Sequence, residues 1–228
     1  MVRIPSEYQE VEWIESTGGQ YIDLPFGFDP TDKIETKFSI TDSRSTDRYI
    51  VSPIEWNTNN NRFAMGVHAV YAVGFGGSTT STTRLSPNTN NDGHIHEWHY
   101  SNRLFEIVDL GRSKDVSAIN FGSTTANLRL FYGYSTNTRG KIATYYHKKA
   151  DGTKVNLIPC YRKSDNEIGM YDTVTKTFFT NQGTGTFLKG GNVYDTEYDK
   201  NIEINHGETI VRLSDEYQEV EWIESTGT

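Results

Sequence analysis

The sequence HIHEWH at residues 94–99 places three histidines within six residues, and imidazole nitrogens are common zinc ligands. In an extended strand successive side chains point to opposite faces, so His94 and His96 share one face and His99 lies on the other. Two histidines on one face leave a zinc site short of ligands unless an acidic side chain arrives from another strand. We therefore favour a packed or solvated β-strand over a metal site here.

Carboxylates alternate in EVEWIE at residues 10–15, and most glycosidases place two carboxylates on either side of the bond that they cleave. On a strand Glu10 and Glu12 share one face, whereas Glu15 points to the other. Solubilising glutamates on an outer face explain this pattern better than a catalytic pair. The sequence also lacks a G-x-S-x-G motif and a phosphate-binding glycine loop. We predict that the protein is not an enzyme, with a glycoside hydrolase as a less favoured alternative.

Two loops are rich in side-chain oxygens. The segment TDSRSTD (41–47) contains Asp42 and Asp47, and NTNND (88–92) contains Asp92. Carboxylate and amide oxygens are the ligands that Ca²⁺ prefers, although neither segment has the spacing of an EF-hand loop. Asn and Asp also form turns by bonding their own backbone. The three aspartates are therefore candidates for calcium, the one cofactor that the sequence suggests, beside an ordinary turn interpretation.

Aromatic residues next to loops suggest a site for sugars. A glycan site typically combines an aromatic surface, on which a pyranose ring stacks, with a few polar groups that bond the hydroxyls. Trp13 and Trp98 lie in the middle of predicted strands, so we expect both to be packed. The predicted carbohydrate-binding residues are Trp56, Asn57, Asn59, Arg62, Tyr132, Tyr134, Asn137 and Arg139.

Short β-strands must position these residues. Thr, Tyr, Phe, Val and Ile cluster in short runs separated by Gly, Asn, Asp and Ser, and no helix-length apolar periodicity is present. Asp151-Gly152 is the strongest hairpin signal in the chain. The pattern predicts an all-β, two-sheet antiparallel sandwich of the jelly-roll type. Strands are expected at 8–15, 20–24, 32–40, 48–56, 94–100, 104–110, 126–134, 141–150 and 154–161. The apolar run at 62–75 is too long for one strand, and we expect it to divide near Gly66.

The composition narrows the possible partners. The chain has 228 residues and a formal net charge of −8, which argues against a nucleic-acid partner because such proteins usually present a basic surface. The 14 Tyr, 11 Phe and 4 Trp supply enough large rings for a core despite a mean hydropathy of −0.64. The single cysteine, Cys160, lies in the apolar sequence NLIPCY, where we expect a buried thiol. The sequence holds no apolar run of 18 residues, so we expect no insertion into a membrane.

Several segments resemble a known module. PSEYQEVEWIESTGGQYID (5–23), LRLFYGY (128–134) and the run from KIATYY to GTGTF (141–187) resemble the laminin-G-like or concanavalin A-like jelly-roll modules of gut-bacterial surface proteins and phage or prophage tail proteins. The resemblance covers about residues 5–190. It implies a two-sheet antiparallel sandwich outside the cell, on a cell surface or a virion. It also implies attachment to a surface glycan or receptor, and it carries over no catalytic residue.

A twelve-residue sequence occurs twice in the chain. EYQEVEWIESTG is found at residues 7–18 and again at residues 216–227, 209 positions later. This spacing has the size of a domain. We expect a module at 1–190, a connector at 191–213 and the first strand of a further tandem repeat at 214–228, which could also pair with a neighbouring chain. The sequence thus predicts one unit of an array for glycan attachment, with a structural spacer that binds no ligand as the alternative.

Overall fold

Alternating buried and exposed residues form short antiparallel strands, as the sequence predicts. The structure, a computed structural model, describes residues 4–41, 48–54, 63–68, 71–76, 82–85, 93–117, 123–124, 126–133 and 136–193. Strand β4 (Lys33–Ile40) illustrates the alternation, because Ile34, Thr36 and Phe38 are buried whereas Lys33 and Lys37 are exposed. Among the described residues the only helix is the 3₁₀ turn η1 (Val108–Leu110).

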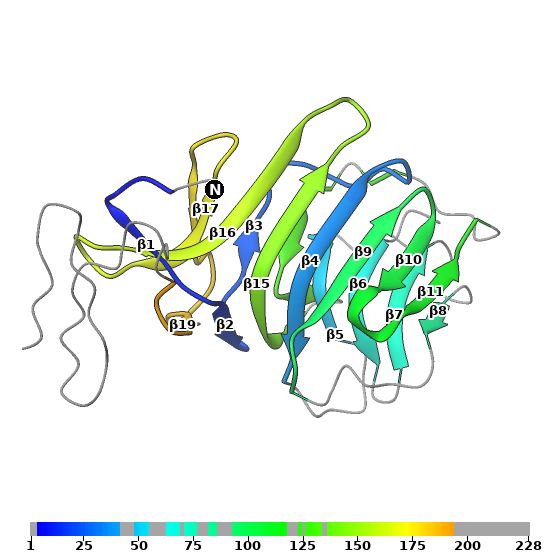
Figure 1. The fold of residues 1–228 in the computed structure, drawn as a ribbon, viewed down its shortest axis with the longest axis horizontal. Coiled ribbons are helices and arrows are strands. Elements are labelled where there is room, and N and C mark those ends of the chain that lie inside the picture. The colour runs from blue at the N-terminus through cyan, green and yellow to red at the C-terminus, as the bar shows by residue number, and fades with distance from the viewer. Residues whose placement is uncertain are drawn as a thin grey trace, which may run out of the picture. The chain divides into compact units, whose positions relative to one another are not determined.

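An eleven-stranded sheet forms one layer of the fold (Figure 1). Three short strands lie off the main path of this sheet, since β1 pairs with β16 and β2 pairs with β15 and β19. All the described pairings are antiparallel, which is the predicted arrangement. The order of the main path is β11 (Arg112–Asp115), β10 (Leu104–Ile107), β9 (His96–Ser101), β4, β15 (Arg139–Lys148), β16 (Lys154–Arg162), β17 (Ile168–Asp172) and β18 (Phe178–Thr180), and the added strands are β1 (Tyr8–Glu10), β2 (Ile14–Thr17) and β19 (Leu188–Lys189).

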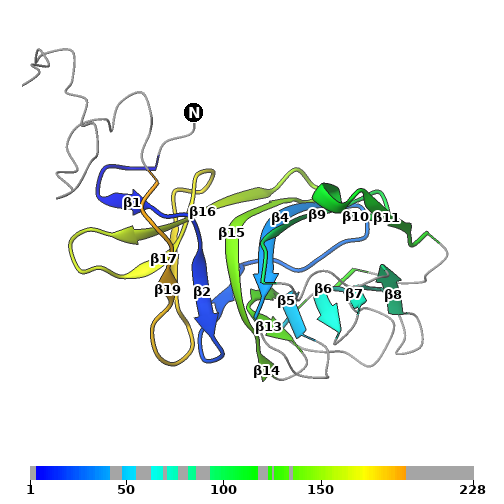
Figure 2. The ribbon, with the colours of Figure 1, turned by 60° about the horizontal axis from the view of Figure 1, so that its bottom comes forward.

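A six-stranded sheet forms the second layer, and Figure 2 shows the larger sheet arching over it. Its order is β3 (Ile22–Asp23), β12 (Leu128–Leu130), β5 (Arg48–Pro53), β6 (Phe63–His68), β7 (Tyr71–Gly76) and β8 (Thr82–Leu85). A small hairpin of β13 (Tyr132–Gly133) and β14 (Thr136–Asn137) lies against β5. Gly133 permits this close approach, because a Cβ there would overlap the Tyr49 ring. The two layers confirm the predicted β-sandwich, whereas the jelly-roll strand order stays a prediction.

Aromatic rings fill the space between the two sheets. Phe63 of β6 stacks on Phe28 with ring centroids 3.7 Å apart, and both rings contact Tyr100 of β9 edge-on at 5.4 Å. Trp98 is fully buried and stacks on Phe38 at 5.0 Å, which confirms its predicted packing. Rings bury large apolar areas, so a chain of low mean hydropathy still forms a continuous core.

Several predicted strand boundaries were wrong. The stretch expected as one strand at 8–15 is divided into β1 and β2, because the chain bends at residues 11–13. The apolar run at 62–75 was expected to divide near Gly66, but it divides after His68 and forms the β6–β7 hairpin. The Asp151-Gly152 hairpin is confirmed, with Lys148 opposite Lys154 and Gly152 at a φ of 92°.

The chain separates into two units at residue 191. Residues 1–191 contain both sheets of the sandwich. Of the second unit, residues 192–228, the structure describes Asn192 and Val193 alone.

Candidate functional site

Three of the eight predicted carbohydrate-binding residues lie in the described ranges, and contacts around the turn at Gly18 and Gly19 connect them. Tyr132 and Asn137 face each other across the β13–β14 hairpin. The Asn137 side chain donates a hydrogen bond to the Gly19 carbonyl over 3.1 Å, and the Arg139 side chain lies against Gly18. The other five lie outside the described residues: Trp56, Asn57, Asn59, Arg62 and Tyr134.

Tyr132 belongs to a cluster that the sequence analysis did not identify, and we call Tyr21, Asp23, Arg129 and Tyr132 the tyrosine–arginine cluster. The Arg129 guanidinium carbon lies 3.7 Å from the centroid of the Tyr21 ring and 4.7 Å from that of the Tyr132 ring. The two ring centroids are 6.3 Å apart and the ring planes are tilted by 55°. A guanidinium over an aromatic face is attracted by the ring quadrupole, so each ring helps to hold Arg129 in place.

Asp23 completes the cluster through a bidentate ion pair. Its two carboxylate oxygens accept hydrogen bonds from Nε and Nη2 of Arg129, at 2.5 and 3.1 Å. The Asp23 side chain keeps 36% of its exposure and that of Arg129 keeps 15%, so the pair is open to solvent on one side. A bidentate pair fixes the guanidinium plane, and it uses two of the five N–H groups that an arginine side chain can donate.

The sequence places these residues together through two paired strands. Asp23 of β3 lies directly opposite Arg129 of β12. The neighbouring residues Ile22, Leu128 and Leu130 are fully buried, so the intervening side chains must point away from the core. The alternation of side chains in YID and LRL could have predicted that Arg129 lies on an outer face. The pairing of two short strands 106 residues apart has no signal in a single sequence.

The turn at residues 181–185 fixes one edge of the tyrosine–arginine cluster. The Tyr21 backbone N–H donates to the Asn181 side chain at 3.2 Å, and the Tyr21 carbonyl accepts from the Gln182 N–H at 2.9 Å. The Thr184 N–H donates to the Gly19 carbonyl at 2.9 Å. Tyr21 is thus held from its backbone while its ring remains partly exposed, as is the Tyr132 ring.

No protein-family model, curated protein or solved structure matches the chain. What the tyrosine–arginine cluster can do therefore has to be argued from its chemistry. It offers two partly exposed tyrosine rings, guanidinium donors and carboxylate acceptors at one place on the surface. A small-ligand site is usually composed of an aromatic surface with a few polar groups beside it. Within the described ranges, no helix is long and apolar enough to cross a membrane.

The calcium candidates Asp42, Asp47 and Asp92 all lie outside the described residues. Among the residues that the structure does describe, no group of three His, Cys, Asp or Glu side chains is arranged to hold a metal ion. Calcium at the two oxygen-rich loops stays a prediction.

The histidines of HIHEWH alternate as expected. His96, Trp98 and Tyr100 are buried, whereas Glu97 and His99 lie half-buried on the outer face of the large sheet. His96 Nδ1 lies 2.6 Å from Asp109, and His99 Nε2 lies 2.9 Å from Glu97. The two histidines of this strand thus lie on opposite faces, each beside a different carboxylate, which fits a structural role for both.

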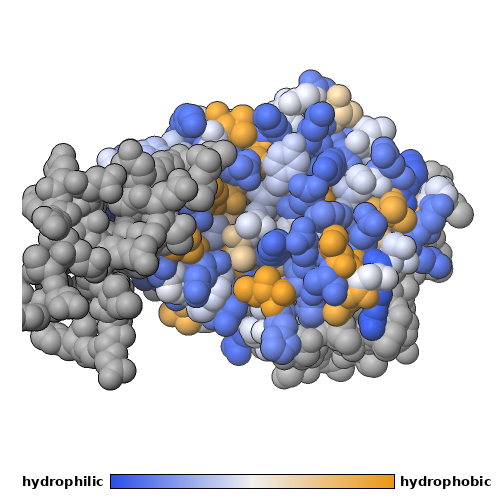
Figure 3. Space-filling view, viewed as in Figure 1, coloured by the Kyte–Doolittle hydropathy of each residue, from blue (hydrophilic) through white to orange (hydrophobic). Residues whose placement is uncertain are grey.

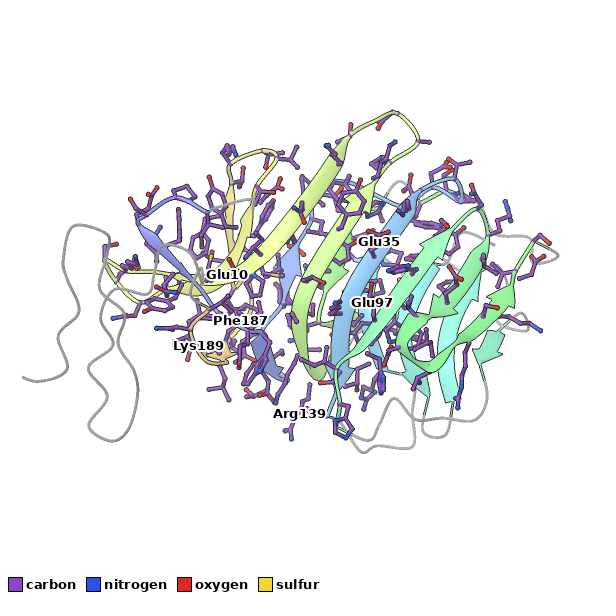
Figure 4. All side chains as sticks on the ribbon, in the orientation of Figure 1. Glu10, Glu35, Glu97, Arg139, Phe187 and Lys189 are labelled. Carbon is purple, nitrogen blue, oxygen red and sulfur yellow. The ribbon has the colours of Figure 1, made fainter. Side chains whose placement is uncertain are left out.

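Carboxylates on the outer face of the large sheet form ion pairs. Glu35 of β4 and Glu97 of β9 point outward from neighbouring strands (Figure 4). Lys33 lies 2.6 Å from Glu35, and Lys37 lies 3.1 Å from Glu97. The part of this face that is coloured in Figure 3 is mostly hydrophilic, with small and separate hydrophobic areas. These pairs are solvated surface contacts, each contributing little to stability.

The three N-terminal glutamates lie beside different residues and do not form a carboxylate pair with one another. Glu10 lies opposite Cys160 in β16, Glu15 lies opposite Lys141 in β15, and Glu12 accepts a hydrogen bond from the Gly191 N–H at 3.1 Å. Strand pairing thus gives each of the three glutamates a different neighbour.

Cys160 is buried, as predicted, and burial raises the pKa of its thiol to about 12. A thiol of this kind is a poor nucleophile at neutral pH.

A buried chain of polar groups joins Tyr145, His147 and Asp32. His147 Nε2 lies 2.9 Å from the Asp32 carboxylate, and the Tyr145 hydroxyl lies 3.0 Å from His147 Nδ1. Asp32 also accepts the backbone N–H groups of Asp29 at 2.8 Å and Ala150 at 3.0 Å. The three side chains are at most 1% exposed, so they tie two loops to the sheet rather than meet a ligand.

We expect His147 to make stability depend on pH. Burial lowers its pKa, and the hydrogen bond to Asp32 opposes this without cancelling it. The unfolded chain therefore binds more protons than the folded protein below the ordinary histidine pKa of about 6.5. The stability that the neutral His147 contributes is complete above this pH and is lost as the pH falls below it. The free energy of unfolding then decreases by at most about 1.4 kcal/mol per pH unit.

Urea denaturation between pH 5 and pH 8 measures this effect, with the steepest change expected below pH 6.5. The control is His147→Gln, which removes the titrating group, so its free energy of unfolding should decline less between pH 7 and pH 5. Equal declines in the two proteins would contradict the assignment.

Proposed function

We propose that this protein is a non-enzymatic attachment module that binds glycans at the tyrosine–arginine cluster. The observation that carries the proposal is the pair of partly exposed rings, Tyr21 and Tyr132, beside the Asp23–Arg129 ion pair. Pyranose rings present an apolar face that can lie against a tyrosine ring, while their hydroxyls can bond Arg129 donors and Asp23 acceptors. Asn137 and Arg139 lie close enough to the same turn to extend the site.

The setting that we propose follows from the sequence resemblance. The module has a jelly-roll fold and stands on a cell surface or a phage tail, where the partner is a surface glycan or receptor. The repeat of residues 7–18 at 216–227 supports an array in which adjacent modules follow one another. The sandwich places the cluster on the outer side of the smaller sheet, away from the packed core.

We expect replacement of Tyr132 by alanine to weaken glycan binding by about tenfold or more, because truncating an aromatic side chain at the centre of a contact commonly costs over 1.4 kcal/mol. The change also removes one of the two rings that hold Arg129. Binding is measured on an array of bacterial and host glycans, with calcium and again with chelator, followed by titration of the best ligand.

The matched control is Tyr146→Ala, since Tyr146 is a partly exposed tyrosine on β15, outside the tyrosine–arginine cluster. It should bind as the unchanged protein does. Equal losses in the two variants would remove the cluster from the proposal. Loss with Trp56→Ala but not with Tyr132→Ala would move the site to the predicted loop at residues 56–62. Sensitivity to chelator would point to Asp42, Asp47 and Asp92.

Two alternatives give different results in the same experiment. A structural spacer gives no saturable signal from a folded sample under either condition. A glycoside hydrolase needs two facing carboxylates in one groove and would release product from the bound glycan. Glu35 and Glu97 are outward carboxylates on adjacent strands, but their lysine partners neutralise them, which favours binding without catalysis.

A further inference from the structure

Residues 7–18 occupy a site formed by three other strands. β1 pairs with β16, with Tyr8 opposite Arg162, and β2 pairs with β15 from Ile14 opposite Ile142 to Thr17 opposite Arg139. β2 also pairs with β19 on its other side. We call the surface formed by β15, β16 and β19 the strand seat. Backbone pairing of this kind is independent of sequence, so the side chains decide which segment fits.

Apolar side chains of the segment anchor it in the strand seat. Val11 is 1% exposed and Ile14 is 0% exposed. The Tyr8 ring contacts Tyr171 and Phe178, with centroids 5.0 and 4.8 Å away. The Trp13 ring lies 4.1 Å from Lys141 Nζ. The segment thus has anchors at residues 8, 11, 13 and 14, and the first of them reaches β17 and β18 beside the strand seat.

The second occurrence of the sequence carries the same anchors. Tyr217, Val220, Trp222 and Ile223 correspond to Tyr8, Val11, Trp13 and Ile14, 209 positions earlier. The match ends at residue 18, one residue after the last paired position, Thr17. The repeated sequence therefore contains every residue that pairs with the strand seat, and it can make the same contacts there.

We propose that the strand seat of one chain accepts residues 216–227 of a second copy of the chain in place of its own residues 7–18. The sequence contains the segment at both 7–18 and 216–227, and the described residues form one strand seat that either copy could fill. The entering and the displaced segment bury the same side chains, so the exchange replaces like with like. The resident segment is tethered directly through Gly19, which favours it in dilute solution, and the exchanged form increases with chain concentration.

The end of the match sets the limit of the exchange. A Cβ at Gly19 would lie 2.8 Å from the Thr184 carbonyl oxygen, and the second occurrence has Thr228 at this place. The entering segment can therefore occupy the strand seat as far as Gly227, and its chain must leave the seat after that residue. The proposal does not depend on glycan binding, because the strand seat and the tyrosine–arginine cluster are formed by different residues.

Cysteine trapping tests the proposal in the full chain. Thr17 and Arg139 are directly opposite and both exposed, and directly opposite Cα atoms in an antiparallel pair are close enough for a disulfide. One chain carries Thr226→Cys and the other carries Arg139→Cys; native Cys160 is buried in both. After mixing under oxidising conditions we expect a disulfide-linked species of twice the 25.9 kDa chain mass, in amounts that rise with concentration.

The matched control pairs Thr226→Cys with Lys37→Cys, an exposed position on β4 outside the strand seat. Trapping at residue 139 should exceed this control by about tenfold or more, because a seated pair holds its thiols at a high effective concentration. Adding Ile223→Asp should abolish the excess, since its counterpart Ile14 is fully buried. Thr17→Cys with Arg139→Cys in one chain verifies the geometry.

Light scattering over a range of concentrations gives a second measure without cysteines. The unchanged chain should gain mass with concentration, while Ile223→Asp should stay monomeric. Trapping no better than the Lys37→Cys control, together with constant mass, would overturn the proposal. An internal disulfide in a chain with both Thr226→Cys and Arg139→Cys, without any linked pair of chains, would show entry into the chain's own seat and would also overturn it.

Discussion

Replacing Asp32 with alanine is expected to lower the free energy of unfolding by about 3 kcal/mol or more, because three N–H donors lose their acceptor at about 1–3 kcal/mol each. These donors are His147 Nε2 and the backbone N–H groups of Asp29 and Ala150. The carboxylate is 0% exposed, so water does not replace it without rearrangement of the surrounding loops. Urea denaturation followed by fluorescence measures the loss.

Asp151→Ala is the matched control for Asp32→Ala. Asp151 is an exposed aspartate on the β15–β16 hairpin, and it accepts one backbone N–H, that of Thr153, at 2.9 Å. Its replacement should change stability far less, since water can satisfy the released donor. Asp32→Asn should fall between the two, because the amide keeps one acceptor oxygen. Similar losses for Asp32→Ala and Asp151→Ala would show that the buried network does not hold the loops.

Alternation predicted the strands well because one face of each sheet is buried. His96–Ser101 has the predicted faces and Lys33–Ile40 alternates in the same way, since a shift by one residue would expose Trp98 or Phe38. Turn chemistry predicted the hairpin at Asp151-Gly152 for an equally local reason. Strand breaks were less predictable, because the bend at residues 11–13 depends on β16, β15 and β19, which lie far away in the sequence.

The candidate site was only partly predictable for the same reason. Tyr132, Asn137 and Arg139 stand beside turn-forming residues, and the sequence could single them out by type and position. Tyr21, Asp23 and Arg129 lie within short strands whose neighbours are buried, and the pairing of β3 with β12 brings them to Tyr132. Side-chain type can be read from one sequence, whereas long-range strand pairing cannot.

Replacing Phe63 with alanine is expected to cost about 3–5 kcal/mol of unfolding free energy, the usual range for a fully buried phenylalanine. Phe63 comes from the smaller sheet, and two of its ring partners, Tyr100 and Phe105, come from the larger one. It also stacks on Phe28 at 3.7 Å. The substitution leaves a cavity between the layers, where close packing gives the surrounding rings no room to collapse completely.

Phe63→Leu and Phe179→Ala separate packing between the sheets from general loss of apolar area. Leucine refills most of the cavity, so Phe63→Leu should cost clearly less than alanine at the same position. Phe179 is partly buried at the β17–β18 pairing, and its removal should also cost less. If Phe63→Ala lowered stability no more than Phe179→Ala, the aromatic contacts would not be what joins the two sheets. A large loss at Phe63 alone means that the layer supporting the tyrosine–arginine cluster is held by rings from both sheets.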